Sequence, residues 1–490
     1  MVQIEGSTAA RSHLQILKST AIIGGASLVN IAFAIVRNKV TAMLLGPPGV
    51  GLMALYTSIA DLAHSLAGLG VQSSGVRQIA EAVGTGDQAR IDRTVVALRR
   101  VSLFLGLAGA ALLALFARPV ADLSFADSGH VTALVIVAAS IFFRIVSAGQ
   151  LSLIQGLRHV SDLATISIVG AILSTIISIP LIYWLRQEGI AWSLLAMSIV
   201  TLLTSWYYSR RFKIQTPVAM SFGDMTREIT PLLRLGVVFM ASGFLTAAAA
   251  YAIRIIVSKY DGVVAAGFYQ AAWALAGLYA GFILQAMGTD FYPRLTGASN
   301  DNSTCNRLVN EQAQVSILLA GPGLIATLTA APFVIRLFYS EEFLPAVDIA
   351  RWVCLGMMLR IVSWPMGYII VAKGASKMFF WAEVAAAAVH VGLAAMLVPI
   401  AGADGAGIAF FGLYVWHTGL VYVLVRRLSG FRWTPVNARL AIGFLVAGCT
   451  VFVAFQLLPM WEAIALGASL TLILGLFSLW MLWRLFPQKS

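Results

Sequence analysis

Charged residues are scarce in this chain: 11% of its 490 residues are Asp, Glu, Lys or Arg, whereas 59% are hydrophobic. Soluble domains usually carry about 25% charged residues. A soluble chain of this length would fold into several cores, each coated with polar side chains. Because too few charges are present to form such coats, lipid must be the solvent for most of the surface. The composition therefore predicts an integral membrane protein.

The sequence also lacks the motifs of nucleotide hydrolysis, metal binding and covalent catalysis. The glycines of Gly46-Pro47-Pro48-Gly49-Val50-Gly51 are not followed by the lysine of a phosphate-binding loop, and no H-E-x-x-H occurs. The three cysteines, Cys305, Cys354 and Cys449, have no paired spacing, so neither a disulfide framework nor a thiolate metal site is expected. We expect a membrane transporter, not an enzyme, with no cofactor and no metal.

Apolar stretches long enough to cross a membrane fill the sequence instead. About 20 apolar residues cross a bilayer as a helix. Fourteen stretches fit, near residues 17–45, 48–72, 101–117, 131–156, 161–185, 190–209, 233–258, 263–290, 313–335, 345–372, 376–399, 405–425, 438–457 and 461–483. We therefore predict an all-α fold of 14 transmembrane helices.

Lys and Arg are distributed unevenly between alternate connections. If the N-terminus lies inside, the inner connections hold 23 of these residues and the outer connections hold 5. Short loops rich in Lys and Arg stay on the cytoplasmic side, so we expect a multi-pass protein of the bacterial inner membrane with both termini in the cytoplasm. The net charge of +12 fits this topology. Nucleic-acid binding would require the charge to be gathered on one soluble domain.

An internal repeat runs through the chain. Arg144-Ile145-Val146-Ser147 recurs later as Arg360-Ile361-Val362-Ser363, and we call the shift in numbering from Arg144 to Arg360 the repeat shift. To within two positions, it also aligns Gly51 with Gly267, Arg37 with Arg254, and Gly189-Ile190-Ala191 with Gly407-Ile408-Ala409. Because six is an even number, helices 1–6 and 7–12 enter the membrane in the same direction, as parallel repeats with a substrate site between them. We expect lobes at 1–212 and 213–428, and extra helices 13–14 at 429–490.

Four arginines fall inside predicted spans. Arg144 and Arg360 lie near the middle of helices 4 and 10, and Arg37 and Arg254 lie in the outer halves of helices 1 and 7. A charge inside a span costs about 3 kcal/mol on insertion scales, so it normally faces a cavity or a partner. Guanidinium groups donate paired hydrogen bonds to phosphate oxygens, so we expect the four to bind a diphosphate. Two alternatives stay open: Arg144 and Arg360 could neutralise carboxylates, and Arg37 and Arg254 could snorkel to the interface.

Other polar side chains in the spans have two readings each. Asp61 and His64 lie one turn apart on helix 2. They could be internal ion-pair partners, or they could serve in ion coupling or gating. His390 on helix 11 is typical of a core histidine with satisfied hydrogen bonds. A sugar cleft is expected on helix 8 at Tyr269, Gln270, Trp273 and Gln285, although ordinary packing also explains the aromatic rings.

Two segments resemble a known family. Leu45-Gly46-Pro47-Pro48-Gly49-Val50-Gly51-Leu52 resembles the G-P-x-G-x-G turn of Wzx-type O-antigen and enterobacterial-common-antigen flippases. Residues 368–373 and 380–384 resemble their helix 10–11 junction. With its two lobes and two extra helices, the chain resembles the polysaccharide transporters of the multidrug/oligosaccharidyl-lipid/polysaccharide exporter superfamily.

The resemblance implies a V-shaped, alternating-access flippase for lipopolysaccharide or exopolysaccharide biosynthesis. Its substrate would be an undecaprenyl-diphosphate-linked oligosaccharide, such as an O-antigen repeat unit, carried from the cytoplasmic to the periplasmic leaflet. Helices 1, 2, 7 and 8 would line a cationic cavity with Arg37, Asp61, His64 and Arg254, and helices 13 and 14 would flank a groove for the polyprenyl tail. Expected partners are the lipid-linked glycan, membrane lipid and other glycan-assembly proteins such as a polymerase.

Three other functions stay open at this point. A lipid II flippase would share the fold and the cationic site. A multidrug and toxin antiporter would exchange H⁺ or Na⁺ through Asp61, but it would favour twelve spans and acidic cavity groups. A membrane-embedded ligase or polymerase would carry a large outer loop, and the outer connections here are short.

Overall fold

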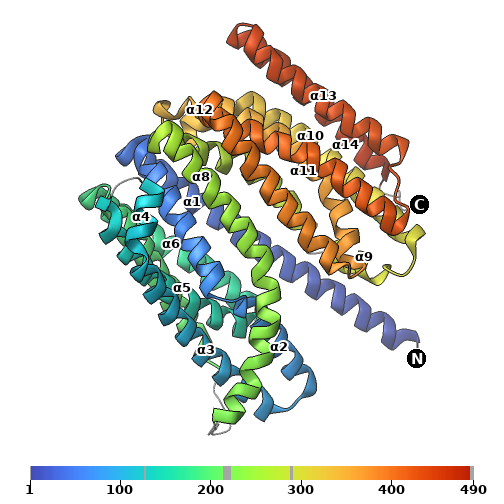
Figure 1. Cartoon of the computed structure of the whole chain (residues 1–490). Helices are drawn as coiled ribbons and strands as arrows, with labels where there is room; N and C mark the ends of the chain where they lie inside the picture. Colours follow the sequence, from blue (N-terminus) through green and yellow to red (C-terminus); the bar gives the residue numbers. More distant parts are fainter. Residues whose placement is uncertain (1, 126–127, 213–221, 287–290, 486–490) are drawn as a thin grey trace. The chain divides into compact units, whose positions relative to one another are not determined.

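The computed structural model describes residues 2–125, 128–212, 222–286 and 291–485, with residues 2–23 described by their backbone alone. All regular elements in these ranges are helices (Figure 1). The first are α1 (Val2–Ala67), α2 (Val71–Thr85), α3 (Gln88–Leu115), α4 (Ala117–Phe125), the 3₁₀ turn Ser128–His130, α5 (Val131–Gly156), α6 (Val160–Leu185) and α7 (Gly189–Ser209). They are followed by α8 (Phe222–Ala286), α9 (Tyr292–Gly297), α10 (Asn302–Phe338), the 3₁₀ turn Glu341–Phe343, α11 (Ala346–Ala372), α12 (Ser376–Ser429), α13 (Pro435–Leu457) and α14 (Met460–Leu485).

Three of these helices each make two membrane crossings. In the described chain, eleven helices are long and apolar enough to cross a membrane. Of these, α1, α8 and α12 are interrupted by a non-helical glycine, at Gly46, Gly262 and Gly402 respectively. Because each interruption divides one long helix into two spans, the described residues make fourteen crossings. The predicted all-α fold with fourteen transmembrane helices is confirmed.

The repeat seen in the sequence extends to the backbone conformation. Positive φ angles, which L-residues adopt only at a cost of about 1–2 kcal/mol, recur at matched positions. The repeat shift relates three pairs of them: Gly46 (62°) with Gly262 (86°), Arg158 (60°) with Gly374 (68°), and Arg186 (52°) with Gly402 (59°). The helices of the two lobes are therefore broken and reversed at equivalent points, in agreement with two parallel six-helix lobes.

The described chain divides into two compact units, Met1–Tyr251 and Ala252–Ser490. In the first unit, α5 packs against α3 and α7, and α6 packs against α1 and α7. In the second, α11 packs against α10 and α12, and both α13 and α14 pack on α10. The domain boundary expected between 212 and 213 falls at the edge of residues 213–221, which lie outside the described part of the chain, and it stays a prediction.

Small residues let α5 approach its neighbours closely in the first unit. A Cβ atom added at Gly149 would lie 2.2 Å from Ser102 Oγ of α3, and one added at Gly156 would lie 2.6 Å from Ile79 Cβ of α2. Helices in lipid associate through such contacts, because burying apolar surface gives no advantage where the solvent is itself apolar. Larger side chains at these positions would push α5 away from α2 and α3.

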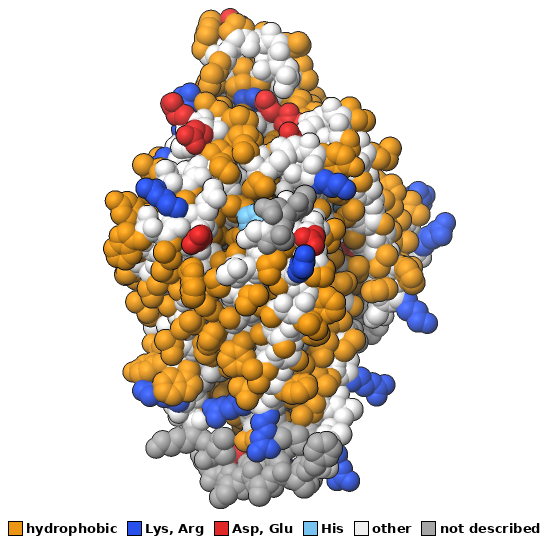
Figure 2. All heavy atoms as spheres, turned by 60° about the vertical axis from the view of Figure 1, so that its left-hand side comes forward, with side chains coloured by type: hydrophobic (Ala, Val, Ile, Leu, Met, Phe, Trp, Pro, Cys, Tyr) orange, Lys and Arg blue, Asp and Glu red, His pale blue; other side chains and the backbone are white. Residues whose placement is uncertain are grey.

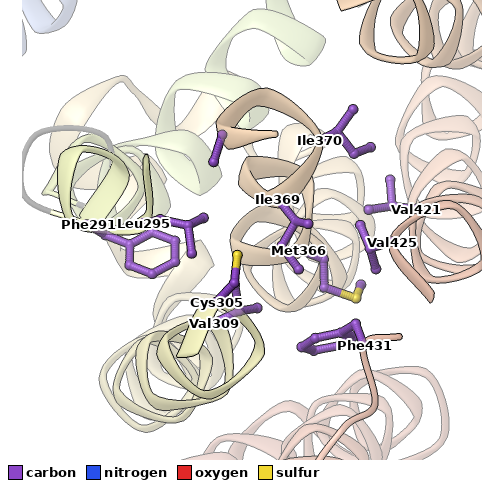
Figure 3. Packing of buried hydrophobic residues seen from close by; sticks show 11 residues of the cluster. Phe291, Leu295, Cys305, Val309, Met366, Ile369, Ile370, Val421, Val425 and Phe431 are labelled. Atoms are coloured by element: carbon purple, nitrogen blue, oxygen red, sulfur yellow. The ribbon is translucent and has the colours of Figure 1, made fainter. Parts of the chain in front are cut away.

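A core of apolar side chains joins four elements of the second unit (Figure 3). Phe291 precedes α9, Cys305 lies on α10, Met366 lies on α11 and Val425 lies on α12, and each is at most 2% exposed. Phe431, in the segment between α12 and α13, closes the cluster with no exposed surface. The chain entering α13 is thereby fixed to the second lobe.

A buried polar network makes the same connection. Asn437 Nδ2 on α13 donates to the carbonyl oxygen of Asn310 on α10 over 2.7 Å, and the amide N–H of Thr434 donates to Asn310 Oδ1 over 3.0 Å. Asn310 Nδ2 in turn donates to the carbonyl oxygen of Arg432 over 3.1 Å. Buried polar groups in lipid must be satisfied internally, so this network fixes the position of α13 on α10.

The surface has the character that the composition predicts. Large apolar side chains are exposed on many helices, such as Trp184 (75% exposed) and Ile400 (82% exposed). Figure 2 shows a face on which most side chains are hydrophobic and charged ones are sparse. Monomeric soluble proteins rarely expose apolar surface on this scale, so the chain is a multi-pass membrane protein.

Candidate substrate-binding cavities

An ion pair lies among the membrane-spanning helices of the first unit. Arg144 Nη2 on α5 is 2.6 Å from Asp61 Oδ1 on the second half of α1. The side chains are 31% and 49% exposed, respectively. Asp61 is thus an ion-pair partner of Arg144 in this structure, and a role in ion coupling or gating stays a prediction. The pair also cancels most of the charge that Arg144 would present to an anion.

The ion pair lines a polar cavity of about 360 Å³, which we call the Arg144 cavity. His64, one turn from Asp61, also lines it, and His64 Nδ1 is buried with no hydrogen-bond partner in the described structure. The remaining polar lining is made by hydroxyl and amide side chains: Thr57, Gln72, Ser140, Ser147, Ser174, Ser198 and Thr201. This cavity offers hydrogen bonds but little net charge.

A second hollow of the first unit, of about 530 Å³, surrounds Arg37; we call it the Arg37 hollow. Gln72, Ser174 and Thr201 line both this hollow and the Arg144 cavity, so the two spaces adjoin. Arg37 Nη1 lies 3.7 Å from Met197 Sδ, and Arg37 Nε has no hydrogen-bond partner among the described residues. The guanidinium group thus keeps donor capacity within the hollow.

Asn30 and Ser167 also line the Arg37 hollow. Asn30 Nδ2 donates a hydrogen bond to Ser167 Oγ, which joins α1 to α6. Sequence inspection did not identify Asn30, Gln72, Ser174 or Thr201 as site residues. The signal that could have found them is the recurrence of small polar side chains inside apolar spans, where each one needs a partner.

Arg254, in the second unit, is held by a neighbouring amide. Its Nη2 and Nε donate to Gln270 Oε1 over 2.8 and 3.3 Å, and its Cζ lies 6.0 Å from the centroid of the Tyr269 ring. The two residues come from the two halves of α8, on either side of the break at Gly262. The first half of α8 therefore presents a guanidinium group that the second half orients.

Arg360 faces a cavity of about 330 Å³ within the second unit, the Arg360 cavity. Its Cζ lies 4.7 Å from the centroid of the Trp364 ring and 5.8 Å from that of Tyr414. Among the described residues, no ion pair joins Arg360 to a carboxylate, and Arg360 Nε is buried with no hydrogen-bond partner. Unlike Arg144, this guanidinium is contacted mainly by aromatic rings, which stabilise it by cation–π attraction.

The sugar cleft expected on helix 8 is only partly present. Tyr269 is 3% exposed, so the expectation that its ring stacks on a sugar is wrong for this conformation, because packing covers the ring. Gln270 is engaged by Arg254, and the side chain of Gln285 lies outside the described part of the chain. Trp273 does line the Arg360 cavity.

Trp364 is the aromatic residue that the sequence reasoning missed. It lies one turn after Arg360 on α11. The available signal was therefore the spacing of four residues between an arginine and an aromatic residue, which places both on one face of a helix. His390 is 9% exposed, and its ring lies 5.7 Å from that of Phe410. That packing is typical of a core histidine, but His390 Nε2 is buried with no hydrogen-bond partner among the described residues, so the expectation of satisfied hydrogen bonds is wrong.

Apolar hollows accompany α13. One, of about 260 Å³, is lined mainly by apolar side chains of α10, α11 and α13, including Leu324, Met358 and Phe444. Another, of about 300 Å³, lies between α13 and α14, with Leu440 and Phe477 on its walls and Arg439 at its edge. Because both linings are mainly apolar, these spaces suit hydrocarbon.

Two six-helix lobes with polar cavities among their membrane-spanning helices define a membrane transporter, not an enzyme. The match of a sequence model to residues 40–348 shows the family: the chain belongs to the family described as "Polysaccharide biosynthesis protein". Solved structures of transporters share this fold, among them two described as members of the MOP superfamily.

Relatives among characterised proteins include two lipid III flippases, of Escherichia coli (strain K12) and Shigella flexneri. Each is 23% identical to this chain over 438 residues, which is 84% of this chain and all of the relative.

Similar solved structures include the lipid II flippase MurJ in an inward closed conformation, with a TM-score of 0.71 at 16% identity, covering 93% of this chain and 98% of that one. An inward-facing multidrug resistance transporter of the MATE family gives a TM-score of 0.69 at 16% identity, covering 82% and 94%. A third similar structure is a MOP superfamily transporter from Pyrococcus furiosus, which is described as having a binding pocket of reversed polarity. Its TM-score is 0.61 at 17% identity, and the match covers 86% of this chain and 96% of that one. At these identities the likeness shows the fold alone.

Proposed function

We propose that this chain is a flippase for an undecaprenyl-diphosphate-linked oligosaccharide, an O-antigen or exopolysaccharide repeat unit. It carries this lipid from the cytoplasmic to the outer leaflet of the inner membrane by alternating access, with both termini in the cytoplasm. One observation carries the proposal: Arg37 and Arg360 keep unbonded buried donor atoms while lining cavities among membrane-spanning helices. The names of the lipid III flippase relatives support a lipid-linked glycan as the passenger.

Burying a charge inside the membrane has a free-energy cost that a bound anion can offset. An arginine inside a span costs several kcal/mol unless it faces water or a partner. Among the described residues, no ion pair compensates Arg37 or Arg360. A diphosphate supplies the missing charge and accepts paired hydrogen bonds from a guanidinium fork.

The glycan requires donors and acceptors more than charge. Hydroxyl and amide groups of Asn30, Gln72, Ser174 and Thr201 line the adjoining spaces of the first unit. Ligand sites place a few polar groups in this way to match a polar ligand. Sugar hydroxyls both donate and accept hydrogen bonds, so this lining suits an oligosaccharide better than a hydrophobic drug.

The lipid tail requires neither charge nor hydrogen bonds. We propose that the apolar hollow lined by Leu324, Met358 and Phe444 holds part of the polyprenyl chain. Because Asn310 and Asn437 fix α13 to α10, the hollow keeps its shape while the tail slides along it.

A reconstitution experiment tests the proposal. The purified full chain is placed in liposomes with a fluorescent undecaprenyl-diphosphate-linked oligosaccharide, and a membrane-impermeant quencher reports the label in each leaflet. We expect the protein to expose about all of the label, whereas empty liposomes keep about half protected. Protection equal to that of empty liposomes would contradict the proposal. A parallel deletion strain should accumulate the lipid-linked glycan in the inner leaflet.

A further inference from the structure

The Arg144 cavity and the Arg360 cavity are repeats of one another. The repeat shift carries the helix break at Gly46 onto the break at Gly262, and it carries Gly51 onto Gly267 on the helices that follow. The second and eighth spans therefore align with each other without an insertion or a deletion. Arg144 on α5 and Arg360 on α11 define the same shift.

The repeat shift also relates the residues that line the two cavities. On the span after the break, Thr57 corresponds to Trp273, Asp61 to Gly277 and Ser65 to Gly281; beside the arginines, Ala148 corresponds to Trp364. Thr57, Asp61 and Ala148 line the Arg144 cavity, and Trp273, Gly277, Gly281 and Trp364 line the Arg360 cavity. The repeat thus places equivalent helix positions around an arginine in each lobe.

The first difference between the cavities is the counter-charge. In the first unit, Asp61 Oδ1 lies 2.6 Å from the Arg144 guanidinium. In the second unit the equivalent position is Gly277, which has no side chain. A Cβ atom added at Gly277 or Gly281 meets nothing within 4 Å, so open space lies where a side chain would project. The first lobe pairs its arginine with a carboxylate. Among the described residues of the second lobe, Glu383 on α12 attracts Arg360 electrostatically without forming an ion pair, and the cavity keeps room for a ligand.

The second difference is aromatic surface. Threonine and alanine of the first cavity are replaced by Trp273 and Trp364 in the second. The Trp364 ring contacts the Arg360 guanidinium at 4.7 Å, and the Trp273 ring packs edge-on against Phe410 with centroids 5.0 Å apart. Indole rings displace water and strengthen the hydrogen bonds that a charged neighbour makes.

We propose that the Arg360 cavity is the phosphate-binding subsite of the transported lipid, and that Asp61 keeps the equivalent Arg144 cavity from binding phosphate. The proposal rests on the proposed function and places one phosphate group of the passenger in the second lobe; Arg37 stays a further contact of the passenger. Arg360 donates its free N–H groups to phosphate oxygens, Trp364 holds the guanidinium in place, and Trp273 borders the sugar next to the phosphate. Gly277 is the position that sets the charge of the cavity.

Exchanging Gly277 tests this assignment with a matched pair of variants. Gly277→Asp restores in the second lobe the carboxylate that the first lobe carries, whereas Gly277→Asn adds nearly the same volume without charge. Binding of geranyl diphosphate to the purified full chain is measured by isothermal titration, with inorganic pyrophosphate as a separate arm. We expect Gly277→Asn to bind geranyl diphosphate within about threefold of the wild type. Gly277→Asp and Arg360→Gln should each bind at least about tenfold more weakly.

The two ligands distinguish a lipid-linked phosphate from a free one. Binding of geranyl diphosphate together with weaker binding of pyrophosphate supports a lipid-linked ligand. Tighter binding of pyrophosphate would overturn the assignment to a lipid-linked phosphate. Thermal unfolding confirms that each variant is folded, and the pair Gly281→Asp and Gly281→Asn replaces the Gly277 pair if those chains do not fold.

The remaining outcomes separate the subsite from the function. If Gly277→Asp binds as well as Gly277→Asn, the Arg360 subsite is wrong even if the wild type moves lipid-linked glycan in liposomes. If the binding pattern holds but the wild type moves no lipid-linked glycan, the proposed function is wrong and the phosphate subsite stands. Loss of binding in Arg144→Gln with no loss in Arg360→Gln would assign the anion to the other lobe.

Discussion

Arg144 donates a hydrogen bond of 2.6 Å to Asp61, a residue 83 positions earlier in the chain. The contact joins α5 to the second half of α1 across the first lobe. Both side chains retain exposure, at 31% and 49%. The pair therefore contributes less to stability than a fully buried one, and its main effect is to set the charge of the polar cavity that it lines.

Asp61→Asn should change ligand binding more than stability. Pairs exposed to solvent contribute about 0–1 kcal/mol, so we expect a small fall in the free energy of unfolding. The variant leaves Arg144 without a carboxylate, and binding of geranyl diphosphate should therefore strengthen. Thermal unfolding and isothermal titration measure the two effects, with Asp61→Glu as the charge-preserving control. Weaker binding in Asp61→Asn would mean that the carboxylate does not act as the competitor of the anion.

Asn437→Ala should destabilise the second unit. Asn437 is 1% exposed, and its Nδ2 donates to Asn310 O over 2.7 Å and to Asn310 Oδ1 over 3.1 Å. Removing the side chain takes away both hydrogen bonds that it donates from α13 to α10, and a typical hydrogen bond contributes about 0.5–1.5 kcal/mol. We expect a lower unfolding temperature in detergent, with the exposed residue variant Ser469→Ala as the control. Equal unfolding temperatures for the two variants would show that the network does not fix α13.

Asp301 gives the stability a defined dependence on pH. Its carboxylate caps α10 by accepting from the amide N–H and hydroxyl of Ser303 and from the hydroxyl of Thr304. These hydrogen bonds, led by the one from Thr304, lower the pKa of Asp301 from 3.8 to about 2. Because the folded-state pKa is lowered, the stabilisation is present above the ordinary pKa and is lost as the pH falls toward 2.

The comparison of the wild type with Asp301→Ala isolates this effect. We expect the wild type to unfold at a higher temperature at pH 6, and the difference to shrink between about pH 4 and pH 2, where the carboxylate takes up its proton. Thermal unfolding across that range measures it. A difference that stays constant down to pH 2 would show that the ionised carboxylate is not the capping group.

Sequence patterns predict the parts of this fold that depend on one helix at a time. Runs of apolar residues mark the spans, and the Gly46-Pro47 and Asp261-Gly262 pairs mark two of the helix breaks, because glycine alone adopts their positive φ angles without strain. The third interruption lies at Ala401 and Gly402, where the backbone leaves the helical conformation, and hydropathy separates the two spans of α12. Each of these signals is local.

Contacts between helices could not be predicted in the same way. The spacing along the sequence identifies Arg144 and Asp61 as polar residues inside spans, but their contact depends on how α5 packs on α1. For Tyr269 the sequence predicts a contact that packing prevents. An aromatic residue beside a polar one is typical of a sugar-binding surface, but in the structure packing covers the Tyr269 ring. Gly277 gives no sequence signal of a binding site. Its role is inferred only when the repeat aligns it with Asp61 and the structure places it in the lining of the Arg360 cavity.

The most direct test of the central claim measures transport by charge variants of Arg37 in liposomes that contain the fluorescent lipid-linked oligosaccharide. Arg37 lines a hollow of about 530 Å³, and its Nε has no hydrogen-bond partner in the described structure. If the guanidinium groups hold a phosphate-bearing passenger, Arg37→Gln should slow transport about tenfold or more. Arg37→Lys should retain part of the transport rate, because lysine keeps the charge but not the paired donors. The double variant Arg37→Gln with Arg254→Gln should be slower than Arg37→Gln alone. Wild-type rates in Arg37→Gln and in the double variant would contradict the account.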